Sequence, residues 1–326
     1  MGGFGEQFLV DVSMNPINAD PWSRSVNADL WERDVDDLLL KIAGCRTGMA
    51  LLRAIRRGGK RILIIPPEPG PMVCNSRTIG HVGNLALKHG NRTYFAFVEI
   101  DPRHYFPGSW CYRVTRGADP THNRASLPDE VLFHELVHAH RRAVGIAPLG
   151  PRGGGLNLYG NGEEFLAVVI TNVYISDGTN HRKSGLRADH SGHRPLETNL
   201  NTSLTFYKSS PQTLTLIKEF AEHKDEKPFF DDLTKVNARF NPFAALRECE
   251  PYVTRLAHSG AALKREVASW IATGATDVSA ALSAAAGATG LIRPAGQPQP
   301  LPPTAGQLAK SVLDPLAEEA LRVLRR

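Results

Sequence analysis

The sequence predicts an α+β protein in which a small mixed sheet packs on a motif-bearing helix and on a second helix that begins with two acidic residues. Residues 61–65 and 92–100 are short apolar runs with the length of buried strands. Residues 131–144 and 161–176 are longer apolar segments with the length of buried helices. We expect the C-terminal part to be mostly helical, because further helices are predicted after two prolines, Pro211 and Pro242.

The elements before the motif helix follow from local periodicity. Apolar residues recur at helical spacing over residues 29–43, Gly44 interrupts the pattern, and a second short helix is predicted over residues 49–55. The strand at 61–65 ends at two prolines, and the strand at 92–100 ends at Asp-Pro. A third and weaker strand is predicted over residues 110–115.

The motif helix has recognisable start and stop signals. Ser126 is the predicted N-cap, Asp129 is its capping-box partner, and Pro128 lies in the first turn. Gly145 and Pro148 end the helix. The helix is apolar on most sides, so we expect it to be buried. Polar residues within it must then face a polar site, because burying them without partners is costly.

Those polar residues form the motif H-E-x-x-H at positions 134–138. His134 and His138 are four residues apart, so on a helix both imidazoles lie on one face and can bind one Zn²⁺ ion. Glu135 lies next to them, where its carboxylate can take a proton from a water molecule beside the metal. The motif therefore predicts two zinc ligands and a general base.

A catalytic zinc normally takes three protein ligands, so a third is needed. The elongated motif H-E-x-x-H-x-x-G-x-x-H fails here, since Arg141 and Val144 replace its Gly and His, and His140 lies on a different face. Glu163 and Glu164 begin the next apolar helix. We predict Glu164 as the ligand, with Glu163 in reserve, because the small Ala167 allows close helix approach. The alternative is that both acids serve only the helix cap and dipole.

Several other polar groups are candidates for the same site. His190 or Tyr174 could donate a hydrogen bond to an oxyanion, and Asp189 could orient a histidine. His190 and His193 could instead hold a second metal, and an ordinary polar loop is the remaining alternative. The strand at 92–100 is a candidate sheet edge for binding an extended peptide. The glycine-rich residues 145–162 are either a mobile flap or a flexible connection.

Composition excludes several classes of protein. Of the 326 residues, 42% are hydrophobic and 22% are charged, as in ordinary globular proteins. No run approaches the about 18 apolar residues of a membrane span. The net charge of +5 is scattered along the chain, so no nucleic-acid partner is expected. The four cysteines form no C-x-x-C pair, which suits a reducing compartment.

The chain begins without a basic and apolar leader, so we expect a cytoplasmic protein, or one secreted by a signal-peptide-independent route. Five segments are predicted along it. They are a loosely ordered lead-in (1–28), a catalytic domain (29–260), an Ala-rich helical segment (261–292), a Pro-rich linker (293–304) and an amphipathic C-terminal helix (305–326).

H-E-x-x-H followed by a Glu-bearing helix resembles the gluzincin group of zincin metallopeptidases. The order of Thr47-Gly48-Met49-Ala50-Leu51-Leu52, a strand, the HELVH helix and the Glu pair is most similar to the NleD-like family of bacterial effector proteases. The resemblance covers roughly residues 45–195 and leaves out the insert at 66–91. It implies a zincin-like fold and a zinc-dependent endopeptidase delivered into host cells, where the best-known members cleave signalling kinases. The alternatives are a metal hydrolase acting on another substrate and a non-catalytic interaction protein.

Overall fold

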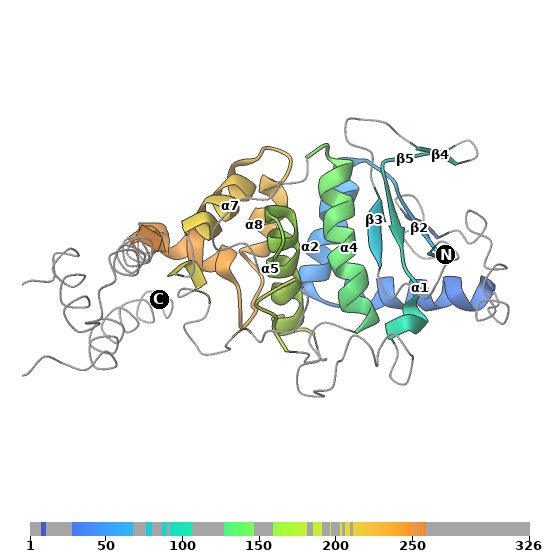
Figure 1. The fold of residues 1–326 in the computed structure, drawn as a ribbon, viewed down its shortest axis with the longest axis horizontal. Coiled ribbons are helices and arrows are strands. Elements are labelled where there is room, and N and C mark those ends of the chain that lie inside the picture. The colour runs from blue at the N-terminus through green and yellow to red at the C-terminus, as the bar shows by residue number, and fades with distance from the viewer. Residues whose placement is uncertain are drawn as a thin grey trace, which may run out of the picture. The chain divides into compact units, whose positions relative to one another are not determined.

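The molecule is a mixture of helices and short strands, seen in a computed structural model (Figure 1). The chain divides into two compact units, residues 1–199 with 216–241, and residues 200–215 with 242–326. The residues that the structure describes are 8–10, 28–67, 76–79, 87–89, 92–105, 127–146, 159–180, 185–190, 196, 203, 206–208, 211–251, 253–255 and 257–258.

The first unit contains a four-stranded mixed sheet, which confirms the predicted small mixed sheet. Its order is β1 (Phe8–Val10), β2 (Ile62–Ile65), β6 (Ala96–Glu99) and β3 (Arg77–Ile79). The first three strands are parallel, and β3 runs antiparallel to β6 at the edge. Every residue of β2 and β6 is buried, as expected of parallel strands covered on both faces.

The predicted strand at 92–100 is wrong as a single element. It divides at Phe95 into β5 (Arg92–Tyr94) and β6. The two halves belong to different sheets, because β5 pairs with β4 (Leu87–His89) while β6 pairs with β2 and β3. An unbroken apolar run does not reveal which partners its two ends will choose.

Two strands lie where none was predicted, and one prediction is untested. β1 lies within the expected lead-in, and β3 lies within the insert at 66–91. Both are three residues long and gain their stability from pairing rather than from local pattern. The strand predicted at 110–115 lies outside the described residues.

Helices α1 (Ala28–Ala43) and α2 (Arg46–Gly58) confirm the predicted pair separated by a break at Gly44. Their junction is tight. Cys45 caps α2, and its sulfur accepts a hydrogen bond from the backbone N–H of Gly48. A Cβ atom placed on Gly48 would lie 1.7 Å from the carbonyl oxygen of Ile42, so the junction closes only around a glycine.

The motif helix α4 (Pro128–Ala143) lies between the sheet and α5 (Gly162–Ser176) in Figure 1. The two helices run antiparallel, since Tyr174 near the end of α5 stacks on Phe133 near the start of α4. Pro128 occupies the first turn as predicted. The cap differs from the prediction, because Leu127 is the N-cap and makes no side-chain cap bond. Ser126 lies outside the described residues.

Further helices follow Pro211 and Pro242, as predicted. They are α7 (Pro211–Glu222), α8 (Lys227–Leu233) and a helix that begins at residue 242. Two short 3₁₀ turns, η3 (Pro102–Tyr105) and η5 (Phe206–Lys208), complete the described elements. The segments predicted at 261–292, 293–304 and 305–326 lie outside the described residues, so these boundaries remain predictions. In the described part of the chain, no helix has the length and apolar character that crossing a bilayer requires.

Candidate metal site

Three side chains from α4 and α5 meet in one cluster. Nε2 of His134 lies 3.1 Å from Nε2 of His138, and Oε2 of Glu164 lies 3.2 Å from each of them. Each residue thus offers one ligand atom to a common centre. The predicted trio of His134, His138 and Glu164 is brought together by the fold.

Local structure explains why these atoms converge. The histidines are four residues apart on α4 and share a face, which here is turned toward the first turn of α5. Asn161 caps α5, and its side-chain oxygen accepts a hydrogen bond of 2.8 Å from the backbone N–H of Glu164. The cap therefore fixes the backbone of Glu164 while its carboxylate remains free for the histidines. Capping of α5 by Asn161 and a metal-ligand position for Glu164, considered as alternatives from sequence, are therefore compatible.

The cluster fits a zinc ion. Ligand atoms at zinc-bond distance from a tetrahedral ion lie about 3.3 Å from one another, close to the 3.1–3.2 Å found here. The donor set of two imidazoles and one carboxylate is that of catalytic zinc sites. The side chains of His134 and His138 are only 6% exposed, whereas that of Glu164 is 23% exposed. One side of the cluster is thus open to a further ligand.

Glu163, the reserve candidate, has a different position. Its Oε1 atom lies 3.0 Å from Nδ1 of His138, the ring nitrogen that faces away from the cluster. Both of its oxygens also accept hydrogen bonds from Nε of Arg141. A carboxylate in this position orients a metal-bound histidine and fixes its tautomer. Glu163 therefore supports a ligand and does not occupy the ligand triangle.

The second nitrogen of His134 has two neighbours. Nδ1 lies 3.1 Å from Nη2 of Arg187 and 3.4 Å from the Thr171 hydroxyl. Arg187 can only donate, so Nδ1 accepts its hydrogen bond. Thr171 donates its own proton to the Ala167 carbonyl, which leaves its oxygen as the acceptor for Nδ1–H in the other tautomer. Burial and the charges of His138 and Arg187 lower the pKa of His134 to about 3. The ring is therefore neutral, as a ligand must be.

His138 differs in its protonation. Burial acts to lower its pKa, but hydrogen bonds to Glu163 and Glu164 outweigh that effect and raise the pKa to about 9. Glu163 faces Nδ1 and Glu164 faces Nε2, and the proton on Nε2 lies at the position that a divalent cation would take.

Glu135, the predicted base, lies beside the cluster and is tied to the sheet. Its Oε2 atom lies 2.6 Å from the hydroxyl of Thr78 in β3, which also contacts the backbone carbonyl of Glu135. Burial raises the pKa of Glu135. The backbone carbonyl of Thr78 accepts a hydrogen bond from Arg142, one helical turn beyond His138. Through Thr78, β3 thus contacts both Glu135 and Arg142 of α4.

His190 reaches the cluster as predicted. Its Nε2 atom lies 3.1 Å from Oε2 of Glu164, and its ring stacks on that of His134 with centroids 5.8 Å apart. The side chain is 49% exposed, so it stands at the open side of the cluster. Asp189 is buried, and His193 lies outside the described residues, so a His190–His193 metal pair stays untested.

The structure does not support the prediction that Tyr174 is the oxyanion donor. Its hydroxyl donates to Oδ2 of Asp129, in the first turn of α4 and more than one turn before His134. The ring is buried against Phe133. Sequence spacing could not show this, because α5 turns the face that carries Tyr174 toward the start of α4.

Two contacts of the cluster were missed by sequence reasoning. Arg187 belongs to the polar run before His190, but nothing in the sequence aims its guanidinium at His134. Asn172 in α5 exchanges two hydrogen bonds with the backbone of Arg187 and so holds it there. Thr78 lies in the unmatched insert and has no motif signal at all.

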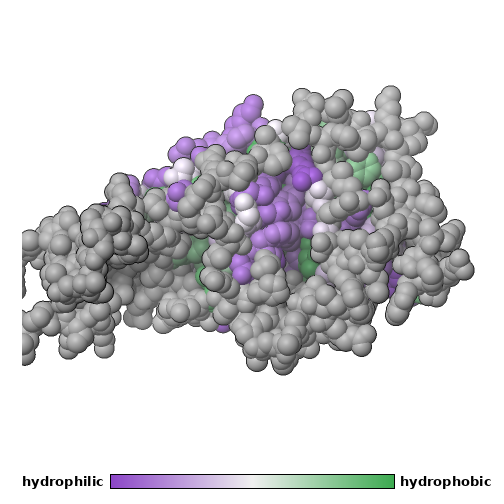
Figure 2. All heavy atoms as spheres, in the orientation of Figure 1, coloured by the Kyte–Doolittle hydropathy of each residue, from purple (hydrophilic) through white to green (hydrophobic). Residues whose placement is uncertain are grey.

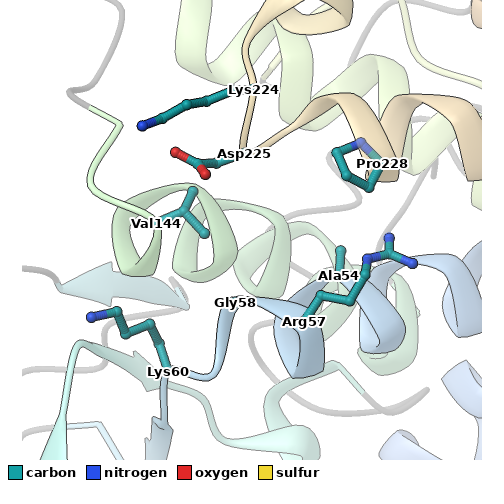
Figure 3. Close-up of a pocket in the computed structure, with 8 residues that line it drawn as sticks. All are labelled: Ala54, Arg57, Gly58, Lys60, Val144, Lys224, Asp225 and Pro228. Carbon is teal, nitrogen blue, oxygen red and sulfur yellow. The ribbon is translucent and has the colours of Figure 1, made fainter.

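Hydrophilic residues gather over the middle of the view in Figure 2, where Figure 1 shows α4 and α5. A hollow of ≈ 310 Å³ lies at the C-terminal end of α4, between Val144 and the segment that joins α7 to α8 (Figure 3). No residue of the histidine–glutamate cluster lines it.

Comparison of the chain with protein-family models, curated proteins and solved structures gives no match. The cluster itself is therefore the basis for assigning a function.

Proposed function

We propose that this protein is a zinc-dependent endopeptidase of the gluzincin type. The observation that carries the proposal is the triangle of His134, His138 and Glu164, with Glu135 beside it on the same helix. Two histidines and one carboxylate with an adjacent glutamate are the arrangement of peptidase sites that activate water. The placement of α4 between a small mixed sheet and α5 supports a zincin-like fold.

The three residues of the triangle would hold the zinc ion. Bound there, zinc lowers the pKa of water and polarises a carbonyl group. Glu135 accepts a proton from the attacking water and delivers it to the leaving amine. Thr78 fixes the Glu135 carboxylate by its hydrogen bond of 2.6 Å. His190, whose half-exposed ring lies beside Glu164, would donate a hydrogen bond to the oxyanion that develops on the substrate.

The substrate strand would run along β3. β6 cannot take this role, because it is paired on both sides, and β5 belongs to the two-stranded sheet rather than to the sheet that packs on α4. β3 is the edge strand next to α4, and its Thr78 touches the base. An extended peptide added to a sheet edge gains main-chain hydrogen bonds irrespective of its sequence, which suits a protein substrate.

The test combines metal content with catalysis. We expect the purified chain to contain about one zinc ion and to cleave members of a peptide library. Glu135→Gln should retain the zinc and lose cleavage, since it removes only the proton acceptor. A wild-type protein without bound zinc, or cleavage that survives in Glu135→Gln, would refute the proposal. Zinc bound without any peptide cleavage would favour a metal hydrolase acting on another class of substrate.

A further inference from the structure

A network of buried charged side chains extends from His138, on the side opposite to the ligand triangle. Nδ1 of His138 contacts Glu163, and both oxygens of Glu163 accept hydrogen bonds from Nε of Arg141, at 2.8 and 3.1 Å. On its other side, Nη1 of Arg141 contacts Oε1 of Glu226. The network therefore has four members: His138, Glu163, Arg141 and Glu226.

This network is buried inside the protein. Arg141 and Glu226 are each 2% exposed, and Glu163 is 5% exposed. Replacing a buried ion pair by apolar residues is often neutral for stability, so stability alone does not explain its presence. A guanidinium presents a rigid, planar fork that can hold two carboxylates in fixed directions, which a lysine cannot do. The arrangement of Arg141 between two glutamates therefore indicates a geometric task.

Glu226 comes from a distant part of the chain, the α7–α8 segment at residues 223–226. In Figure 3 this segment lies beside the end of α4, with Lys224 and Asp225 bordering the hollow next to Val144. The segment and the end of α4 thus both line this hollow. On the inner side, Glu226 attaches the segment to Arg141.

We propose that Arg141 and Glu226 are positioning residues that fix the ring of His138 for metal binding. Glu226 holds the guanidinium of Arg141 from behind, and Arg141 holds the Glu163 carboxylate. Glu163 in turn sets the orientation and tautomer of His138. This inference rests on the zinc site proposed above and extends it to residues that touch neither metal nor substrate. Through it, the α7–α8 segment contributes to metal affinity.

The test is zinc affinity, measured by competition with a chromophoric chelator at a temperature where circular dichroism shows each protein folded. Arg141→Lys keeps the charge but loses the fork, and Glu226→Met keeps the length but loses the acceptor. We expect each to weaken zinc binding by about 10-fold or more, the usual effect of losing support behind a ligand.

Asp232→Asn is the matched control. Asp232 lies in α8, the helix that follows Glu226, and its ion pair with Arg57, at 2.9 Å, attaches α8 to α2 without any link to His138. We expect its zinc affinity to stay within about 2-fold of wild type, since surface ion pairs contribute little. If Glu226→Met does not fold, Arg141→Lys against Asp232→Asn decides the matter.

The outcomes separate this inference from the proposed function. Wild-type affinity in both Arg141→Lys and Glu226→Met overturns the inference while the zinc site stands. An equal loss in Asp232→Asn also overturns it, because general loosening of α8 would then be the cause. A wild-type chain that binds no zinc refutes both proposals. A chain that binds zinc as expected but cleaves no peptide refutes only the peptidase.

Discussion

The hydroxyl of Thr78 lies 2.6 Å from Oε2 of Glu135, joining an edge strand to the motif helix across 57 residues of sequence. A base that must collect and return a proton has to hold one orientation, and the hydrogen bond from β3 provides it. The same hydroxyl lies 2.9 Å from the backbone carbonyl oxygen of Glu135, so its one proton is shared between two acceptors of the same residue.

Thr78→Val should therefore lower kcat while leaving zinc content unchanged. The valine keeps the shape of the threonine but removes its hydroxyl, so Glu135 loses its anchor. We expect a reduction of about 10-fold, on the order of one hydrogen bond to a charged group. Kinetic assays with a cleaved peptide and zinc analysis check this.

Thr78→Ser is the matched control, since it keeps the hydroxyl and should retain kcat within a small factor. Equal kcat in Thr78→Val and wild type would show that Glu135 is oriented without Thr78.

Substitutions of the two adjacent glutamates should affect zinc binding to clearly different degrees. Glu164→Ala removes a ligand and should abolish stable zinc binding. Glu163→Ala removes the support of His138 and should weaken zinc binding by about 10- to 100-fold while still allowing one ion per chain at saturation. Zinc titration monitored by chelator competition distinguishes the two, and the reverse order of effects would exchange the roles assigned to them.

Gly48→Ala should destabilise the fold strongly. The added methyl group would lie 1.7 Å from the Ile42 carbonyl oxygen, a backbone atom that cannot move without opening the α1–α2 junction. We expect a loss of about 3 kcal/mol, the upper range for overpacking. Chemical denaturation of the two proteins measures the difference.

Gly58→Ala in the same helix is the control for that substitution. Its new methyl group would meet only a side-chain atom of Val144, at 3.3 Å. Since alanine is also the better helix former, the expected change is small. A loss as large as that of Gly48→Ala would mean that the close approach of Gly48 to the Ile42 carbonyl is not the cause of the destabilisation.

Glu226 should make stability depend on pH. Its burial, opposed by Arg141, raises its pKa to about 7, compared with 4.5 for the unperturbed group. The folded state then binds this proton more tightly than the unfolded state does. The stabilising contribution is present in full below pH 4.5 and is lost as pH rises through 7.

Relative to Glu226→Gln, which cannot titrate, the wild type should thus lose stability between pH 4.5 and 7. The slope should be at most about 1.4 kcal/mol per pH unit. Denaturation of both proteins across this range, with zinc removed by a chelator, gives the comparison. A constant difference between them would show that Glu226 does not titrate there.

Much of the helical structure could be predicted from the sequence. Each long helix has an apolar repeat and a local stop, such as Gly44 or Gly145, and these signals act over a few residues. The strands were harder. The run at 92–100 was assigned as one strand because nothing local indicates that its halves pair with different partners.

The sequence by itself determined the local geometry of the candidate site. Four-residue spacing places His134 and His138 on one helical face, with Glu135 beside them, wherever that helix lies. The N-cap Asn161 likewise determines where α5 begins, so the two glutamates lie in its first turn. Both features depend only on helix geometry and short-range hydrogen bonds.

Only the tertiary structure decided which groups surround those residues. The antiparallel packing of α4 and α5 gives Glu164 to the ligand triangle, Glu163 to the back of His138, and Tyr174 to Asp129. Thr78 and Glu226 reach α4 from 57 and 85 residues away, from segments without a motif. Such contacts arise from the way separate elements pack, and no spacing within one helix or strand encodes them.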